Sequence, residues 1–148
     1  MTLSDITTGS TGLWGLFVSA FISSTLAPGG SEVVLALLVT AREHPISLLI
    51  TLATLGNTLG AMTTWYLGAL VARRWPSDDP LDKNRHRAVL ALRKYGYAAL
   101  FFTWLPVVGD ALCFAAGWLN LSIPFGTLFI LIGKLIRYIV VAYLALQI

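Results

Sequence analysis

The sequence has few charged side chains. Only 11% of its 148 residues are Asp, Glu, Lys or Arg, and 57% are hydrophobic, whereas about 25% of a soluble domain is usually charged. Several uncharged runs exceed the roughly 20 residues that a membrane-spanning helix needs. The uncharged runs cover residues 6–31, 45–72, 95–109, 111–133 and 138–148. The composition excludes an ordinary soluble domain and predicts one all-α integral membrane domain over residues 1–148.

Cysteine and histidine are also scarce. The single Cys113 can form no internal disulfide, and His44 and His86 lack metal-ligand spacing. We therefore expect no disulfide framework, no metal site and no cofactor. No activated serine or Cys–His pair is recognisable, so no catalytic residue is assigned and an enzyme is the least expected class. The first residues, MTLSDITTGSTG, contain no Lys or Arg before the apolar run, so a removable secretory signal is not expected.

The basic residues are concentrated between residues 73 and 94. This stretch has seven Lys or Arg and three Asp, and the positive-inside rule places such a loop in the cytoplasm. That role explains the basic run without nucleic acid, so no nucleic-acid partner is expected. The segment WPSDDPLDKN reads as a linker, and RHRAVLALRKY, which Gly96 ends, predicts a short amphipathic helix at the interface.

The two sides of this linker share a motif. PGGSEVVLALL in the first half matches PVVGDALCFAAG in the second, which aligns Pro28 with Pro106 and Glu32 with Asp110. The match predicts two repeats, residues 12–72 and 96–148, separated by a cytoplasmic linker and interfacial helix at 73–95. Interrupted apolar segments at corresponding positions of two halves are typical of repeat-built transporters.

A second correspondence follows in each half. Asn57, preceded by Gly56, lies 25 residues after Glu32, and Lys134, preceded by Gly133, lies 24 residues after Asp110. We expect Asn57 to form hydrogen bonds between helices. The Gly56 and Gly60 pair predicts close packing with a neighbouring helix, and if this face is exposed it favours a homodimer.

The motifs predict breaks inside the apolar segments. Proline removes a backbone donor and glycine permits tight reversals, and non-helical backbone at membrane depth must be buried in protein or line a cavity. We therefore expect re-entrant helical hairpins at 12–41 and 96–119, and spanning helices at 45–72 and 124–148. The residues assigned to the breaks are Pro28, Gly29, Gly30, Pro106 and Gly109. With one spanning helix between them, the hairpins would enter from opposite sides, as inverted repeats whose tips meet near the midplane.

Four charged residues lie within or beside the apolar segments: Glu32, Asp110, Lys134 and Arg137. An unpaired charge at a helix centre costs on the order of 2.5 to 3.5 kcal/mol, so the two acids should pair with the two bases. These four residues and Asn57 form the predicted substrate- and proton-binding site. Two alternatives remain open: the acids could cap the second helix of each hairpin, and the bases, Arg137 in particular, could extend to the interface.

Several segments together resemble the DedA superfamily of small membrane proteins, most closely its YqaA-like branch. They are SSTLAPGGSEVVLALL, LGNTLGAMTTWYLG, LRKYGYAALFFTWLPVVGDALCFAAGWLNLS and GKLIRYIVVAYL, which cover nearly the whole chain. The resemblance implies a multi-pass inner-membrane protein that moves a polyprenyl phosphate or phospholipid between leaflets, with protons as the coupling ion. A glutamate follows the first hairpin proline in that family, which corresponds to Glu32.

The sequence departs from the family in the second hairpin. Better-studied members carry arginines beside the proline there, whereas this chain has Trp104 and Asp110 near Pro106. Lys134 and Arg137 are then the residues that would supply positive charge to a phosphate. Two other functions remain open: a proton-coupled exchanger of a small ion or solute, and a membrane scaffold without transport.

Overall fold

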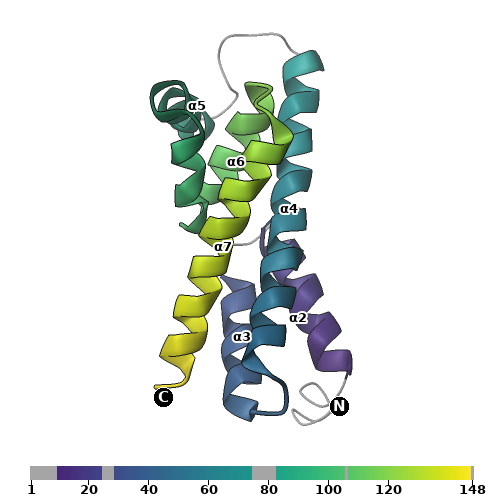
Figure 1. Ribbon diagram of the computed structural model, residues 1–148. Helices are drawn as coiled ribbons and strands as arrows, with labels where there is room; N and C mark the ends of the chain where they lie inside the picture. Colours follow the sequence, from purple (N-terminus) through teal and green to yellow (C-terminus); the bar gives the residue numbers. More distant parts are fainter. Residues whose placement is uncertain (1–9, 25–28, 75–82, 106, 148) are drawn as a thin grey trace. The chain divides into compact units, whose positions relative to one another are not determined.

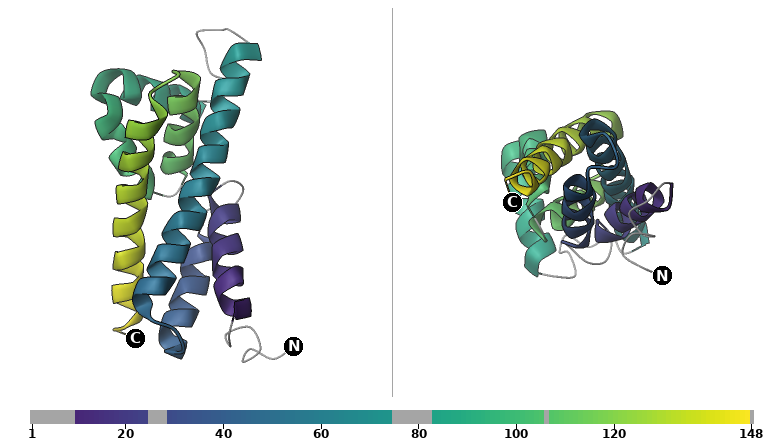
Figure 2. Two further views of the ribbon diagram at one scale, coloured as in Figure 1. Left: turned by 45° about the vertical axis from the view of Figure 1, so that its right-hand side comes forward. Right: turned by 90° about the horizontal axis from the view of Figure 1, so that it is seen from below.

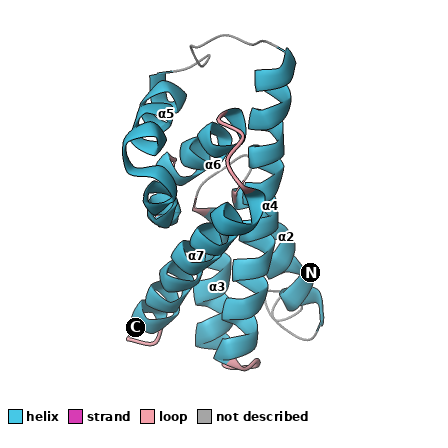
Figure 3. Cartoon of the chain, turned by 45° about the horizontal axis from the view of Figure 1, so that its top comes forward, coloured by secondary structure: helices cyan, strands magenta, loops and turns pink. Residues whose placement is uncertain are grey.

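The computed structural model describes residues 10–24, 29–74, 83–105 and 107–147 (Figure 1). Within these ranges the regular structure is entirely helical (Figure 3), which confirms the predicted all-α class. The helices in chain order are α2 (Ser10–Ser23), α3 (Gly30–Ala41), α4 (Ile46–Arg74), α5 (Lys83–Tyr95), the 3₁₀-helix η1 (Gly96–Trp104), α6 (Val108–Trp118) and α7 (Ile123–Ala145).

Two of these helices are long and apolar enough to cross a membrane. α4 has 29 residues and α7 has 23, so at 1.5 Å per residue they are about 43 and 35 Å long. The hydrocarbon core of a bilayer is about 30 Å thick. Both predicted spanning segments are therefore continuous helices, with bounds that lie within a few residues of the predicted ones.

The chain packs into two compact units. The first consists of the residues up to Gly60 and those from Lys134 onward, and the second consists of Ala61–Gly133. Each long helix contributes one part to each unit. This division by packing differs from the division into sequence repeats, which stays a prediction.

In the first unit, α2 and α3 lie side by side and run in opposite directions (Figures 1 and 2). The first part of α4 and the last part of α7 complete this unit. Its core is made of small and aliphatic side chains with one tyrosine from α7; the buried members are Leu16, Ala20, Leu35, Leu38, Val39, Leu49, Ala53, Tyr138, Ala142 and Ala145. Burial of these apolar groups against one another holds the four segments together.

Glycines let α4 approach α2 closely. A Cβ atom at Gly56 would lie 2.6 Å from the carbonyl oxygen of Phe17, and one at Gly60 would lie 2.5 Å from that of Phe21. The predicted close-packing role of this pair is confirmed. The expectation that the pair forms an exposed dimer face is wrong, because both glycines are buried under α2.

The second unit is built from α5, η1, α6 and the adjoining parts of α4 and α7. Its core includes Val89 and Leu92 of α5, Leu100 of η1 and Phe114 of α6. The predicted helix before Gly96 is present, and Gly96 ends it with a positive φ of 60°. The segment after Gly96 is wound as a 3₁₀-helix, whose third-neighbour hydrogen bonds make it tighter than the helix that the sequence predicted.

Candidate functional site

An ion pair joins α3 to α7 in the first unit. The guanidinium Nη2 of Arg137 contacts Oε1 of Glu32, and the two side chains are 10% and 26% exposed. Glu32 is the third residue of α3, which starts after Gly29 with a positive φ of 107°. A carboxylate in the first turn of a helix is favoured by the helix dipole. The α3 start and the last part of α7 therefore bring opposite charges together in an apolar sequence.

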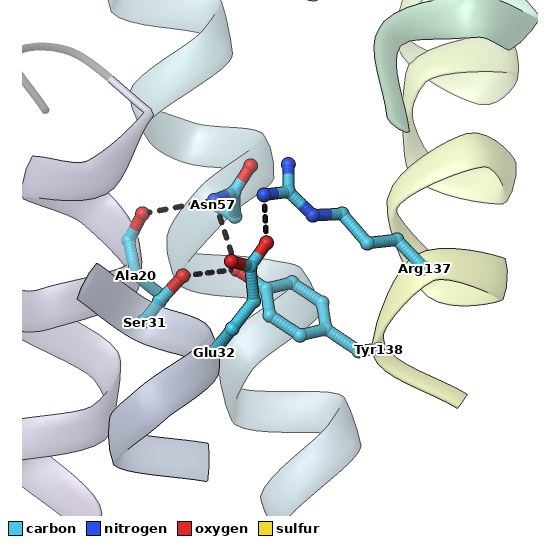
Figure 4. A network of polar contacts seen from close by, with 6 residues as sticks. All are labelled: Ala20, Ser31, Glu32, Asn57, Arg137 and Tyr138. Atoms are coloured by element: carbon cyan, nitrogen blue, oxygen red, sulfur yellow. Dashed lines mark hydrogen bonds and ion pairs between the residues drawn. The ribbon is translucent and has the colours of Figure 1, made fainter. Parts of the chain in front are cut away.

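A hydrogen-bonded network lies beside this ion pair (Figure 4). The amide nitrogen Nδ2 of Asn57 donates to the carbonyl oxygen of Ala20 at 3.2 Å and to the hydroxyl of Tyr138 at 2.9 Å. Because the Tyr138 oxygen accepts from Asn57, its own proton is available to the Ser31 hydroxyl, 2.9 Å away. The network connects α2, α3, α4 and α7 within one unit.

The polar groups of this network are deeply buried. Tyr138 and Ser31 are 0% exposed and Asn57 is 2% exposed. A buried polar group is costly unless it is hydrogen-bonded, and both amide hydrogens of Asn57 are used. The network therefore fixes the relative register of the helices that make up this unit.

Two buried side-chain oxygen atoms on α4 have no hydrogen-bond partner among the described residues. In the described part of the chain, Oδ1 of Asn57 and Oγ1 of Thr54, one turn away on α4, have no hydrogen-bond partner. Lys134 is 2% exposed and lies four residues before Tyr138 on α7, so the two side chains share one helix face. Asn57 and Thr54 therefore keep hydrogen-bonding capacity that the described network does not use.

The structure brings three of the five predicted site residues into one region of the first unit: Glu32 and Arg137 form the ion pair, and Asn57 belongs to the network beside it. Lys134 belongs to the same unit. Asp110 is the third residue of α6 in the second unit.

The alternatives left open for Glu32 and Arg137 are decided by their contact. The expected pairing of Arg137 with an acid is confirmed, and the alternative that it extends to the interface is excluded, because its guanidinium contacts Glu32 and its side chain is 90% covered. The N-cap of α3 is Gly29, so Glu32 is not the cap residue itself. Its carboxylate acts in the first turn as the partner of a cation.

The predicted break residues have different roles. Pro28 and Pro106 lie outside the described residues. Gly29 precedes α3 with a positive φ of 107°, and its role in a hairpin break stays a prediction, whereas Gly30 and Gly109 lie in the first turns of α3 and α6. Gly109 instead allows close packing, because a Cβ there would collide with the carbonyl oxygen of Thr103.

Sequence reasoning missed Ser31 and Tyr138. Each directly precedes or follows a predicted charged residue, and Tyr138 is four residues after Lys134, on the face that the charges already marked. That spacing was a usable signal. Ser31 carried none, since serine is common in the first turn of any helix.

The ion pair combines a group that can take up a proton with a group that can bind an anion. A carboxylate that can be protonated competes with an incoming anion for the same guanidinium, and a guanidinium binds carboxylate and phosphate oxygens with similar geometry. Within the described residues no group of three or more His, Cys, Asp or Glu side chains is placed to hold a metal ion.

Three curated proteins are similar to the chain over most of its length. It is 42% identical over 136 residues to the inner membrane protein YqaA of Escherichia coli and to that of Shigella flexneri, covering 91% of this chain and 92% of each relative. It is 41% identical over 138 residues to an uncharacterized protein of Haemophilus influenzae, covering 88% and 85%. No protein-family model matches the chain, and no solved structure matches it.

Proposed function

Because the chain belongs to the family of the inner membrane protein YqaA, we propose that this inner-membrane protein is a transporter that moves a lipid phosphate between leaflets with proton coupling. The substrate class is a polyprenyl phosphate or a phospholipid. Membership of the wider DedA superfamily is consistent with the family and with this activity.

The observation that carries the proposal is the contact between Arg137 and Glu32. A permanently charged guanidinium is the group that a phosphate would bind, and here a carboxylate occupies it. When Glu32 is protonated, its hold on Arg137 weakens and the phosphate can take its place. When Glu32 loses the proton, the ion pair re-forms and the phosphate leaves. One proton is thus bound and released for each anion.

The neighbouring groups support the same cycle. Lys134 adds a second buried cation one turn from the network, and the free Oδ1 of Asn57 can accept a hydrogen bond from a protonated head group. An intramembrane ionisable residue is a functional-site hypothesis by default because its insertion is costly. If these residues had a purely structural role, apolar side chains would fill the same space at a lower free-energy cost.

Short helices support re-entrant hairpins. α2 and α3 have 14 and 12 residues, which corresponds to about 21 and 18 Å, less than the roughly 30 Å of the hydrocarbon core. α6, with 11 residues, is about 16 Å long. In our proposal each pair of short segments enters the membrane and returns on the same side.

Helix register supports an inverted repeat. Glu32 and Asp110 are each the third residue of a short helix, α3 or α6, and Asn57 and Lys134 are each the twelfth residue of a long one, α4 or α7. Together with the basic, cytoplasmic loop between them, this favours two copies of one plan inserted in opposite directions.

The test is leaflet exchange of a polyprenyl phosphate in reconstituted vesicles loaded with a pH-sensitive dye. We expect the wild type to exchange lipid and to move protons with it, and Glu32→Gln to lose the proton signal. Arg137→Gln should lose both. Glu43→Gln, an exposed acid that follows α3, is the matched control and should behave as wild type.

Three results would contradict the proposal. An unchanged proton signal in Glu32→Gln, at the wild-type rate of lipid exchange, would remove Glu32 from the mechanism. Proton movement driven by a soluble anion without lipid exchange would favour a solute exchanger. Exchange no faster than in protein-free vesicles would favour a scaffold.

A further inference from the structure

A cavity lies in the second unit, between α5, η1 and α6. Its volume is about 680 Å³, within the roughly 300 to 1,000 Å³ that is typical of small-molecule sites. Its lining residues are Arg87, Ala88, Ala91, Tyr95, Ala98, Ala99, Phe102, Val107, Val108, Ala111 and Leu112. It shares no residue with the polar network around Glu32.

The space between the three elements is left unfilled because alanine, a small residue, recurs on each of them. Alanines of α5, η1 and α6 stand where a larger aliphatic side chain would fill the space; they are Ala88, Ala91, Ala98, Ala99 and Ala111. Protein interiors are normally packed to crystal-like density, so an apolar space of this size is suited to an apolar guest. The flexible methylene chain of a lipid meets that requirement, since it can follow an irregular wall and form no hydrogen bonds.

Polar side-chain groups line only the α5 wall of the cavity. Of the lining residues, which all lie in the described part of the chain, only Arg87 and Tyr95 have side chains with polar groups, and both are exposed. Both lie on α5. Tyrosine at the edge of an apolar region is typical of the membrane interface, and an arginine there suits a phosphate, which it can bind through two parallel hydrogen bonds.

Two further basic residues lie in the last turn of α5. Arg93 and Lys94 are exposed in its last turn, and the Lys94 Nζ lies 5.1 Å from the centre of the Tyr95 ring. The positive-inside rule places this helix on the cytoplasmic side, where the leaflet is anionic and attracts basic segments. The charge, the aromatic edge and the apolar interior thus fit the three parts of an anionic phospholipid.

We propose that this cavity binds one acyl chain of an anionic phospholipid of the cytoplasmic leaflet, with the lipid phosphate on Arg87. The site holds a resident lipid and does not depend on the transport proposal.

The experiment is native mass spectrometry of the purified full chain in neutral detergent, titrated with dioleoyl phosphatidylglycerol or dioleoyl phosphatidylcholine. We expect the wild type to retain one phosphatidylglycerol at least tenfold more tightly than phosphatidylcholine. Arg87→Gln should lose that preference, because only the head-group contact is removed. Arg93→Gln changes another exposed arginine of α5 that does not line the cavity, and it should keep the preference for phosphatidylglycerol.

A second variant tests the interior. Ala91→Leu places a larger side chain in the cavity and should weaken the binding of both lipids by tenfold or more. If Ala91→Leu does not fold, the comparison of Arg87→Gln with Arg93→Gln decides alone. Equal lipid preference in those two variants would overturn the proposal. A second result would also overturn it: the protein retains no lipid and forms a dimer, and Ala91→Leu abolishes that dimer. A second copy of the chain would then cover the cavity.

Discussion

The guanidinium of Arg137 contacts the carboxylate of Glu32 although 105 residues separate them in the sequence. The contact joins the last part of α7 to the start of α3, and it lies beside the hydroxyl of Tyr138, which binds Ser31 and Asn57 (Figure 4). One small unit therefore combines a charge pair that can exchange a proton with a buried network that holds its helices in register.

The ion pair should show energetic coupling. Glu32→Gln and Arg137→Gln should each destabilise the protein by about 2 kcal/mol, since each leaves a charged partner without its charge-assisted hydrogen bond. The double variant should cost less than the sum, because no unpaired charge remains. Thermal unfolding in detergent of the four proteins measures the coupling.

Strict additivity of these two substitutions would contradict the pairing. Glu43→Gln serves as the control, because Glu43 is exposed and its replacement should change stability by less than about 0.5 kcal/mol. It should also add to Arg137→Gln without coupling.

Tyr138→Phe should destabilise the first unit by about 1 to 2 kcal/mol. The substitution keeps the ring but removes the hydroxyl, so Ser31 and one hydrogen of Asn57 lose a partner in a buried site. Tyr143→Phe, on the same helix but 63% exposed, is the matched control and should be neutral. Equal unfolding temperatures for the two variants would show that the network contributes nothing.

The all-helical fold class could be predicted from the sequence because long uncharged runs are a strong signal. Long uncharged runs can be accommodated only by burial in lipid or protein, and they marked α4 and α7 to within a few residues. The cost of charge in apolar sequence likewise predicted that Glu32 would find a cationic partner, and it did. The spacing of Gly56 and Gly60 predicted close helix packing, because two glycines four residues apart leave one helix face without side chains.

Other features of the site depend on how helices distant in the sequence pack together, which no local sequence pattern encodes. Which base pairs with which acid is decided by how α3 and α7 pack, so the sequence predicted that Arg137 pairs with an acid but could not select Glu32 as the partner. Ser31 is an ordinary first-turn residue until packing brings its hydroxyl within 2.9 Å of the Tyr138 hydroxyl. The 3₁₀ winding of η1 has no sequence signal that separates it from an α-helix.

Gly56→Ala should destabilise the first unit by about 1 to 3 kcal/mol. Its Cβ would lie 2.6 Å from the backbone oxygen of Phe17, a rigid group that cannot turn aside, so α2 must shift away from α4. Gly15→Ala is the control, because no atom lies within 4 Å of its Cβ apart from its chain neighbours and the nearby backbone of α2 itself. It should be neutral or stabilise α2 by up to about 1 kcal/mol. Similar effects for both would contradict the close packing of α2 on α4.

Lys134→Met should make the protein more stable and less active. Lys134 is 2% exposed, so its ammonium group is held away from water at a cost, whereas methionine has similar length without the charge; we expect a gain of about 1 to 2 kcal/mol. If the lysine is retained for a transported anion, lipid exchange in vesicles should fall at least tenfold although unfolding occurs at a higher temperature. Arg74→Met removes an exposed cation at the end of α4 and should change neither. A stabilised Lys134→Met that exchanges lipid at the wild-type rate would show that the buried charge has no part in transport.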